Sequence, residues 1–500
     1  MEAVITITTV PNRVKILKEK FAQSLGLPFQ DLLPELAIQR VIDELKIKYR
    51  CRLFDPFVTL WAFLSQVLDA DKSCHNAVSR VISYLVSEEV EIPSTDTSAY
   101  CQARSRLPEQ LLEKLFSKVA QSLEEKATAE ARLEKLAQPS SSVSFATQPV
   151  SLKQGWANFL SPNSLEYLWC GRNVKVIDGS SVSMPDTIEN QKAYPQPSSQ
   201  KPGCGFPIAK IGVLFSLATG AAIALTIDVM NTHDLKLARK LYGFLNPLDL
   251  LLGDRAFCAY ADLISIKKLG CDAVFRKHQS RKTPMRKGKI IGESDRLVIW
   301  HKPHKCPKGL SKSEFAALPL TLTVREIYYY ILIPGFRTQQ VSLITTLLDT
   351  KTYPSLEIVK LYGFRWEVEV NLRHLKNTLG MDVLHCKTPS MVRKEIYIYL
   401  LAYNLLRSLM WSSGTTYATP PLRLSLQATR HHFSNFIPKL LAATSTQRNQ
   451  IYRTLLKVIV HRSVPERPGR NEPRVRKRRP KSYPLMKQPR SVLRNQLQTA

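Results

Sequence analysis

The chain has 500 residues, of which 44% are hydrophobic, and this content excludes general disorder and allows about two to four domains with real cores. Its 71 lysines and arginines against 41 acidic residues give a formal charge of +30, which favours a polyanionic partner, nucleic acid before an anionic membrane surface. The nine scattered cysteines without CxxC pairs, and an N-terminus without the pattern of a signal peptide, predict a cytoplasmic protein with reduced thiols.

The first 137 residues have helical periodicity, as in FDPFVTLWAFLSQVL. Within them SAYCQARSRL predicts a short helix that follows Ser, Thr and Asp caps and carries Arg104 and Arg106. Such a helix can enter a DNA groove, although two arginines on a helix are more often only solvated. Residues 1–137 are therefore interpreted as a helical DNA-end-binding domain, and the Ser-rich, aperiodic segment 138–155 as a linker.

From residue 156 the pattern changes to a mixture of strands and helices, which predicts a layered α/β sheet with helices on its faces. Residues 156–277 form the first part of this predicted core. Within it, residues 211–227 are uncharged for seventeen positions, so a membrane span at the short limit competes with a hairpin of two buried strands. The Thr219-Gly220 pair divides the run into two apolar halves and favours the hairpin, without a membrane partner.

The second half of the chain begins with a predicted insertion, residues 278–340, which has a basic loop and β-rich pieces. Core character resumes in residues 341–411, which end in an apolar helix, and a further helical region is expected in residues 412–463. Arginine, lysine and proline dominate residues 464–500, so this segment is predicted to be a flexible basic tail.

Two aspartates close predicted strands of the core. Asp178 ends VKVID and Asp254 ends LDLLLGD. Strand ends that face a crevice are where α/β sheets place their chemistry, although an aspartate in this position is also a common turn former. Asp186, in a nearby loop, is expected to do capping or turn work, so Asp178 is the preferred candidate.

The stretch LYGFRWEVEVNLRHLKNTLG, residues 361–380, predicts one helix that stops at Gly380. At 100° per residue, four of its polar residues share a sector roughly 60° wide beside an apolar stripe; they are Tyr362, Arg365, Glu369 and Lys376. A solvated face with ordinary salt bridges has the same pattern. With Asp178 and Asp254, Glu369 makes a three-carboxylate cluster that would repel itself unless cations were bound.

This set of residues suggests a phosphoryl-transfer site. Mg²⁺ prefers carboxylate oxygens, and two ions about 3.5 to 4 Å apart can activate a water or a DNA 3′-hydroxyl and stabilise the leaving oxygen. Arg365 and Lys376 would then hold phosphates, and Tyr362 would donate a hydrogen bond or stack.

The spacing of the four residues is similar to the Tyr-Arg-Glu-Lys signature of family 4 insertion-sequence transposases, enzymes with an aspartate-aspartate-glutamate triad. Three further pieces resemble that family: IDGSSVSMPDT around Asp178, GDRAFCAYADL around Asp254, and SLITTLLD before the signature helix. The resemblance covers roughly residues 170–410 and implies a ribonuclease H-like core with a β-rich insertion between Asp254 and Glu369.

The resemblance also implies an activity and its partners. Asp178, Asp254 and Glu369 would hold two Mg²⁺ ions, which Mn²⁺ can replace, while Tyr362, Arg365 and Lys376 engage the DNA end. Family members cut at terminal inverted repeats and join the freed 3′ ends to target DNA, some through a hairpin, and they work as dimers on paired ends. A location near the bacterial nucleoid follows from this activity.

Hairpin chemistry needs an aromatic residue that stacks with a displaced base, and Trp300 in the insertion is a candidate. Two alternatives to a transposase stay open. One is a metal-dependent nuclease of the same fold, and the other is a catalytically silent DNA-binding inhibitor derived from a transposase. The presence of both aspartates and all four signature residues argues against the inhibitor.

Overall fold

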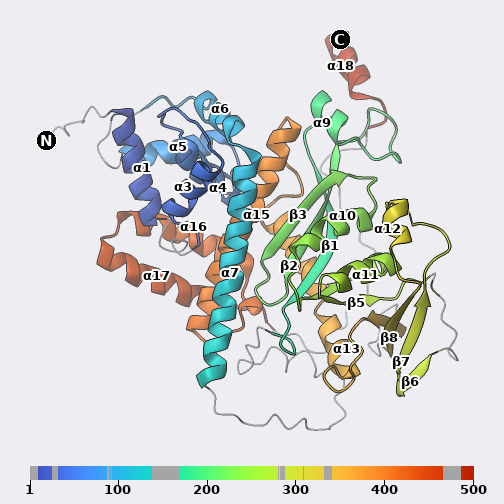
Figure 1. The fold of residues 1–500 in the computed structure, drawn as a ribbon. Helices are drawn as coiled ribbons and strands as arrows, with labels where there is room; N and C mark the ends of the chain where they lie inside the picture. The colour runs from blue at the N-terminus through green and yellow to red at the C-terminus, as the bar shows by residue number, and fades with distance from the viewer. Residues whose placement is uncertain are drawn as a thin grey trace. The chain divides into compact units, whose positions relative to one another are not determined.

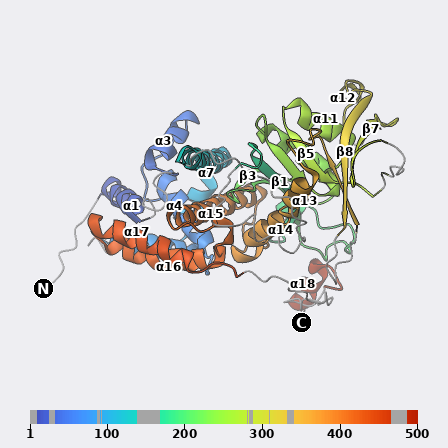
Figure 2. The same ribbon diagram turned by 90° about the horizontal axis from the view of Figure 1, so that it is seen from below.

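The computed structural model describes residues 9–24, 32–86, 91, 93–137, 168–279, 281, 288–307, 309–330, 340–465 and 486–499. The chain divides into two compact units, each seen in Figures 1 and 2. The helical unit contains Met1–Glu130 and Arg373–Pro465, and the sheet unit contains Ala131–Leu372 and Glu466–Ala500. Within the described ranges no helix is long and apolar enough to cross a bilayer. The predicted linker 138–155 lies outside the described residues.

The helical unit is organised around two apolar helices, α4 (Pro56–Leu68) and α15 (Pro389–Thr416), which pack on each other. Almost every residue of α4 is buried, because its sequence lacks a polar face. Its N-terminus is fixed by Asp55, which accepts a hydrogen bond from the Val58 N–H at 2.7 Å. The remaining helices are α1 (Val10–Ser24), α3 (Glu35–Glu44), α5 (Cys74–Val86), α6 (Ser98–Arg106), α7 (Glu109–Ala137), the π-helix η3 (His374–Thr378), η4 (Pro421–Arg423), α16 (Leu426–Ala442) and α17 (Ser445–Val460).

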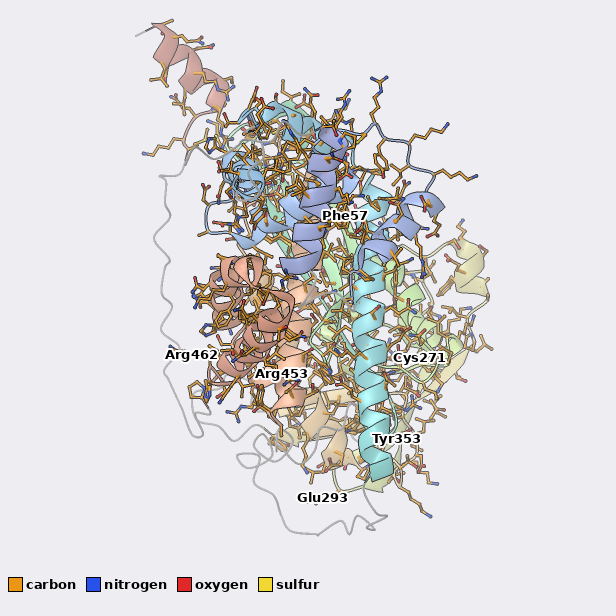
Figure 3. All side chains as sticks on the ribbon, turned by 90° about the vertical axis from the view of Figure 1, so that its left-hand side faces the viewer. Phe57, Cys271, Glu293, Tyr353, Arg453 and Arg462 are labelled. Carbon is orange, nitrogen blue, oxygen red and sulfur yellow. The ribbon has the colours of Figure 1, made fainter. Side chains whose placement is uncertain are left out.

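The position of α15 differs from the predicted segmentation, which assigned residues 341–411 to the catalytic core. The core segment ends at Leu372, and α15 packs against α4, α16 and α17 of the helical unit. Because α15 is buried on nearly all sides from Val392 to Gly414, it needs surrounding helices rather than one face of a sheet. On the outside of this unit Arg453 of α17 and Arg462 are exposed (Figure 3).

The sheet unit contains, in its described residues, one nine-stranded sheet of order β3-β2-β1-β4-β5-β9-β8-β7-β6. Strands β1, β2 and β3 are antiparallel neighbours, and β4 and β5 run parallel to β1. This arrangement confirms the predicted ribonuclease H-like core. The strands are β1 (Val174–Ser183), β2 (Ile208–Ser216), β3 (Ala222–Val229), β4 (Leu250–Gly253), β5 (Asp272–Arg276), β6 (Lys289–Gly292), β7 (Asp295–His301), β8 (Thr321–Tyr330) and β9 (Gln340–Thr345).

Helices cover both faces of this sheet, and Figure 2 shows α11 and α13 on opposite sides of it. On one face α10 contacts β2 and β3, and α11 contacts β5. The helices are α9 (Ile188–Ala193), α10 (Asp234–Leu241), η1 (Tyr242–Phe244), η2 (Arg255–Phe257), α11 (Tyr260–Lys268), α12 (Lys312–Ala316), α13 (Ser355–Gly363), α14 (Trp366–Arg373) and α18 (Arg490–Thr499).

The apolar run 211–227 forms the predicted hairpin, so the competing membrane span is wrong. Strands β2 and β3 pair along their length, and Gly220 has a φ of +69° in the turn between them. The predicted β-rich insertion is also confirmed. Its strands β6, β7 and β8 continue the core sheet beyond β9. Glu326 of β8 is fully buried there and is ion-paired with Arg296 at 3.0 Å.

The predicted flexible tail, residues 464–500, is wrong for its last part, because Arg490–Thr499 forms helix α18. The Arg490 guanidinium donates to Asp186 at 2.5 Å and to the Gly205 carbonyl at 3.2 Å, and these contacts hold the start of the helix. Asp186 also accepts from Gln191, which agrees with its expected turn work. Residues 466–485 of the predicted tail lie outside the described residues.

Candidate active site

The register of two parallel strands brings Asp178 and Asp254 together. Val176 of β1 pairs with Leu252 of β4, and the two aspartates each stand two residues further along. Side chains alternate along a strand, and neighbouring strands lie about 4.8 Å apart. Both aspartates therefore lie on the same face of the sheet, at adjacent strands. Asp254 directly follows β4, as predicted. Asp178 does not end its strand as predicted, because β2 pairs with β1 as far as Ser183.

The two carboxylates have different surroundings. Burial raises the pKa of Asp178 to about 6, the N–H of Gly179 and the charge of Arg365 oppose this rise, and the carboxylates of Glu369 and Asp254 add to it. Asp254 has the N-cap position of η2 but does not use its side chain to cap that turn. Within the described residues its carboxylate makes no hydrogen bond or ion pair. Neither aspartate therefore serves as an ordinary turn former.

The signature stretch 361–380 is not the single regular helix that the sequence predicted. Helix α13 ends at Gly363, two residues form a turn, α14 runs from Trp366, and the π-helix η3 follows it. In the turn the N–H of Arg365 donates to the carbonyl of Tyr362, three residues earlier, so the backbone is wound more tightly there. The predicted stop at Gly380 is confirmed by its φ of +82°.

This broken helix places three of the signature residues around the aspartates. The guanidinium of Arg365 contacts the Glu369 carboxylate at 2.8 Å and lies 4.0 Å from that of Asp178. The Tyr362 hydroxyl donates to the Gly253 carbonyl at 3.2 Å, next to Asp254. Burial alone would lower the pKa of Arg365, but Tyr362, Glu369 and Asp254 raise it overall. Arg365 is therefore the shared counter-charge of the three carboxylates.

Lys376, the fourth signature residue, belongs to the helical unit, on η3. The end of its segment is held by two cations of that unit. Lys72 donates to the Leu379 carbonyl at 2.6 Å, and Arg430 donates to the Thr378 carbonyl at 2.8 Å. In the described part of the chain the ammonium of Lys376 has no ion pair of its own, so it remains available for an anion.

Two residues at this site were not singled out in the sequence. Arg276 at the end of β5 and Tyr329 on β8 both interact electrostatically with Tyr362, and Tyr329 also with Arg365. Burial raises the pKa of Tyr329 to about 12. Local sequence carried no signal for them, because β5 reaches the site through its pairing with β4, and β8 through its pairing with β9.

Two other predicted DNA contacts do not have the expected exposure. Trp300 is only 3% exposed, and the guanidinium of Arg281 covers its ring at 3.8 Å, so neither face is open to a displaced base. Arg104 is buried as well, with its guanidinium 3.2 Å from Gln66 and 3.0 Å from the Cys74 sulfur. In both cases packing in a core has overridden the predicted surface role. Arg106, on the same helix as Arg104, is exposed as expected.

The chain is similar in sequence to known transposases. Residues 169–405 match the family model described as a transposase DDE domain. The chain is 24% identical over 465 residues, 90% of its length, to the transposase InsG for insertion sequence element IS4 of Escherichia coli (strain K12), and 91% of that protein is covered. A solved structure of the piggyBac transposase synaptic complex with hairpin DNA covers 93% of this chain and 87% of its own, with 10% identity and a TM-score of 0.39.

The sheet topology and the two aspartates on adjacent strands accompany a match of residues 169–405 to the model of a transposase DDE domain. The chain is also similar over nearly its full length to an insertion-sequence transposase, which agrees with the resemblance that the sequence pattern indicated.

A DDE domain implies the use of divalent metal ions, and the donors here suit them in kind. Asp178, Asp254 and Glu369 offer only carboxylate oxygens, the ligands of hard cations. In this structure the positive charge of Arg365 neutralises part of their negative charge. In the described residues no group of three His, Cys, Asp or Glu side chains is close enough to hold an ion. The raised pKa of Asp178 shows why a further cation would be favourable there.

Proposed function

We propose that this chain cleaves the ends of an insertion sequence at its terminal inverted repeats and joins the 3′-hydroxyl ends to target DNA. The observation that carries the proposal is the convergence of Asp178, Asp254 and Glu369 around Arg365. In the proposal the three carboxylates hold two divalent ions, Mg²⁺ or in its place Mn²⁺. Bound there, the ions supply an activated oxygen nucleophile and neutralise the leaving oxygen.

The protein's own groups position the DNA. Arg365 can exchange the carboxylates for a phosphate of the scissile strand, since a guanidinium binds either anion with the same bidentate geometry. Tyr362 keeps the backbone after β4 in place through its bond to Gly253, and this fixes Asp254. Lys376 contacts a second phosphate as a point charge. We further propose that two copies of the chain act together on the paired ends.

The test uses a duplex with the element's end, a supercoiled target plasmid and Mg²⁺. We expect wild-type protein to give cleaved ends and then joined product. Each of the changes Asp178→Asn, Asp254→Asn and Glu369→Gln should lower both by roughly a hundredfold or more, because each removes a ligand from a site that stabilises the transition state by several kcal/mol.

Glu367→Gln, on the same helix α14, is the matched control and should cleave like wild type. Cleavage without joined product would indicate the nuclease alternative, and binding without cleavage would indicate the silent inhibitor. Full activity of the Asp178→Asn variant would remove that residue from the site.

A further inference from the structure

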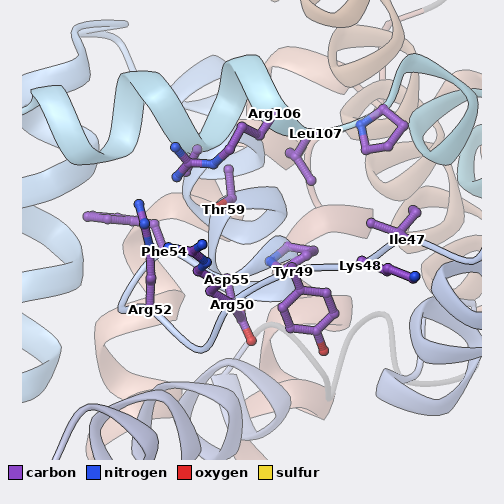
Figure 4. A pocket seen from close by; sticks show the side chains of 13 residues that line it. Ile47, Lys48, Tyr49, Arg50, Arg52, Phe54, Asp55, Thr59, Arg106 and Leu107 are labelled. Atoms are coloured by element: carbon purple, nitrogen blue, oxygen red, sulfur yellow. The ribbon is translucent and has the colours of Figure 1, made fainter.

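The helical unit contains a basic cavity of about 420 Å³ between the segment that joins α3 to α4 and the end of α6 (Figure 4). Its volume falls in the range of pockets that accept nucleotide-sized groups. Four cations line it, namely Lys48, Arg50, Arg52 and Arg106. The only acidic residue in the lining is Asp55, which is buried, caps α4 and lies 3.7 Å from Lys18. The cavity therefore has a strong excess of positive charge.

The four cations are free to bind a ligand. All four are exposed, and in the described part of the chain none of their side chains makes an ion pair or a hydrogen bond. The contrast with Arg104 is informative, because that arginine of the same α6 is buried and bonded to Gln66 and Cys74. Helix α6 thus uses one arginine inside the unit and presents the other, Arg106, to the cavity.

The sequence contains a signal for this surface. Lys46, Lys48, Arg50 and Arg52 recur at every second position of KIKYRCR, and all four are exposed. Tyr49, between two of them, lines the cavity and is 44% exposed. Gathering unpaired like charges is unfavourable unless an anion is bound, and a row of cations with an exposed tyrosine suits a repeating polyanion better than a single small anion.

We propose that this cavity binds the phosphate backbone of duplex DNA, at a position separate from the carboxylate site. The proposal rests on the proposed function, which supplies DNA as the polyanion. Arg50, Arg52 and Arg106 bind phosphate oxygens through their guanidinium groups, and Tyr49 contacts the adjoining sugar. Such contacts position the duplex without reading its sequence.

The first experiment compares the full-length double variant Arg50→Ala/Arg52→Ala with a charge-matched control, Arg40→Ala/Lys118→Ala, whose two cations are exposed outside the cavity. Binding of an end-containing duplex and of an unrelated duplex is measured over a range of salt. We expect the cavity variant to bind both duplexes roughly tenfold more weakly, with a log–log salt slope smaller by about 1.8, since each phosphate that the protein neutralises contributes about 0.9. The control should keep the wild-type slope.

The second experiment needs no substitution. Cys51 is exposed and stands in the chain between Arg50 and Arg52, which line the cavity although Cys51 itself does not, so its alkylation rate in the wild-type protein reports on a duplex that covers this segment. We expect duplex DNA to slow alkylation of Cys51 at least fivefold, as measured on the peptide by mass spectrometry. Exposed Cys306 is measured in parallel as the reagent reference.

An unchanged Cys51 rate together with an unchanged salt slope of the cavity variant, in a preparation that cleaves end DNA, would overturn this assignment and leave the proposed function standing. A wild-type protein that neither binds nor cleaves the duplex would contradict both. If the double variant misfolds, as judged by its thermal unfolding, the Cys51 protection alone decides.

Discussion

Without a bound cation, the negative charge of Asp178 lowers the stability of the folded protein, because burial disfavours the charged form of this carboxyl. Its side chain is 25% exposed, and the carboxylates of Asp254 and Glu369 add to the effect of burial. The hydrogen bond that it accepts from the Gly179 N–H, at 2.7 Å, is one that an amide oxygen can accept equally well. If Asp178 has the proposed role, stability and function therefore oppose each other at this residue.

We expect Asp178→Asn to be more stable than wild type at pH 7.5 in the presence of a chelator, and to lack the proposed activity. A rise of roughly two units in pKa corresponds to a gain on the order of 2 to 3 kcal/mol in the free energy of unfolding. Denaturant unfolding measures it. The control is Asp349→Asn, because the bond from Thr352 lowers the pKa of that exposed carboxyl, and its removal should bring no gain. Equal stability of Asp178→Asn and wild type would contradict the prediction.

His374 predicts how the helical unit responds to acid. Burial lowers its pKa to about 3, with the charges of Arg407 and Arg373 acting in the same direction, and the Arg407 guanidinium lies 3.4 Å from its Nδ1. The unfolded chain takes up this proton near pH 6.5, whereas the folded protein does not take it up until about pH 3. Stability is thus fully present above about pH 6.5 and is lost as the pH falls toward about 3.

For wild type we expect this histidine to account for a loss of about 2 kcal/mol between pH 7 and pH 5. His374→Gln, which keeps an acceptor for Arg407, should lose correspondingly less over that interval. The matched control is His75→Gln, a substitution of an exposed histidine on α5, and it should follow the wild-type curve. Unfolding by urea at both pH values measures the effect, and parallel curves for wild type and His374→Gln would refute the assignment.

At the scale of elements, the signature segment shows what a sequence pattern can and cannot predict. Its spacing identified Arg365 and Glu369, which contact each other, because i and i+4 residues remain neighbours across the tightened turn. The apolar stripe was also correct, since Val368, Leu372 and Leu375 are buried. The break after Gly363 and the π-helix were not predictable, because no proline marks them and the carbonyls at the end are held by remote residues such as Lys72.

The strands were easier to predict than their lengths or their partners. The pieces VKVID and LDLLLGD located β1 and β4, and the apolar run divided by the Thr219-Gly220 pair located the hairpin of β2 and β3. The pattern gave β1 an end at Asp178 because polar residues follow, but pairing with β2 keeps these residues in the strand. Arg104 and Trp300 were assigned to the surface by residue type, and only the tertiary packing shows that they are buried.

The end of the signature segment gives a prediction for Gly380, whose φ of +82° lies in the left-handed region. A Cβ at this position would lie 3.0 Å from Cε of Lys72, the side chain that donates to Leu379. We expect Gly380→Ala to cost about 1 to 2 kcal/mol in the free energy of unfolding. Gly243→Ala is the control, because no atom lies within 4 Å of its added Cβ and its φ is not positive. Equal effects of the two changes, measured by chemical denaturation, would show that Gly380 is not constrained.

At the scale of the whole molecule, the charge of +30 includes three groups of cations that we propose bind DNA. Residues 465–489 contain nine lysines and arginines against two glutamates, the cavity of the helical unit has four unpaired cations among the described residues, and the signature residues contribute Arg365 and Lys376. Phosphate contacts at all three would make binding strongly dependent on salt. They differ in their expected consequence, because in the proposed function only contacts at the carboxylate site would affect the chemical step.

This difference gives a prediction for the end of the chain. Truncation after Val464 should weaken binding to every duplex, whatever its sequence, and reduce the log–log salt slope by about 0.9 for each phosphate that the segment neutralises. Truncation after Pro489 removes α18 but keeps the nine cations, and should retain most of the slope. Filter-binding titrations at several salt concentrations distinguish the two. Because the cavity is intact in both, duplex DNA should still protect Cys51 from alkylation, and an unaltered slope after the longer truncation would show that the basic segment does not contact DNA.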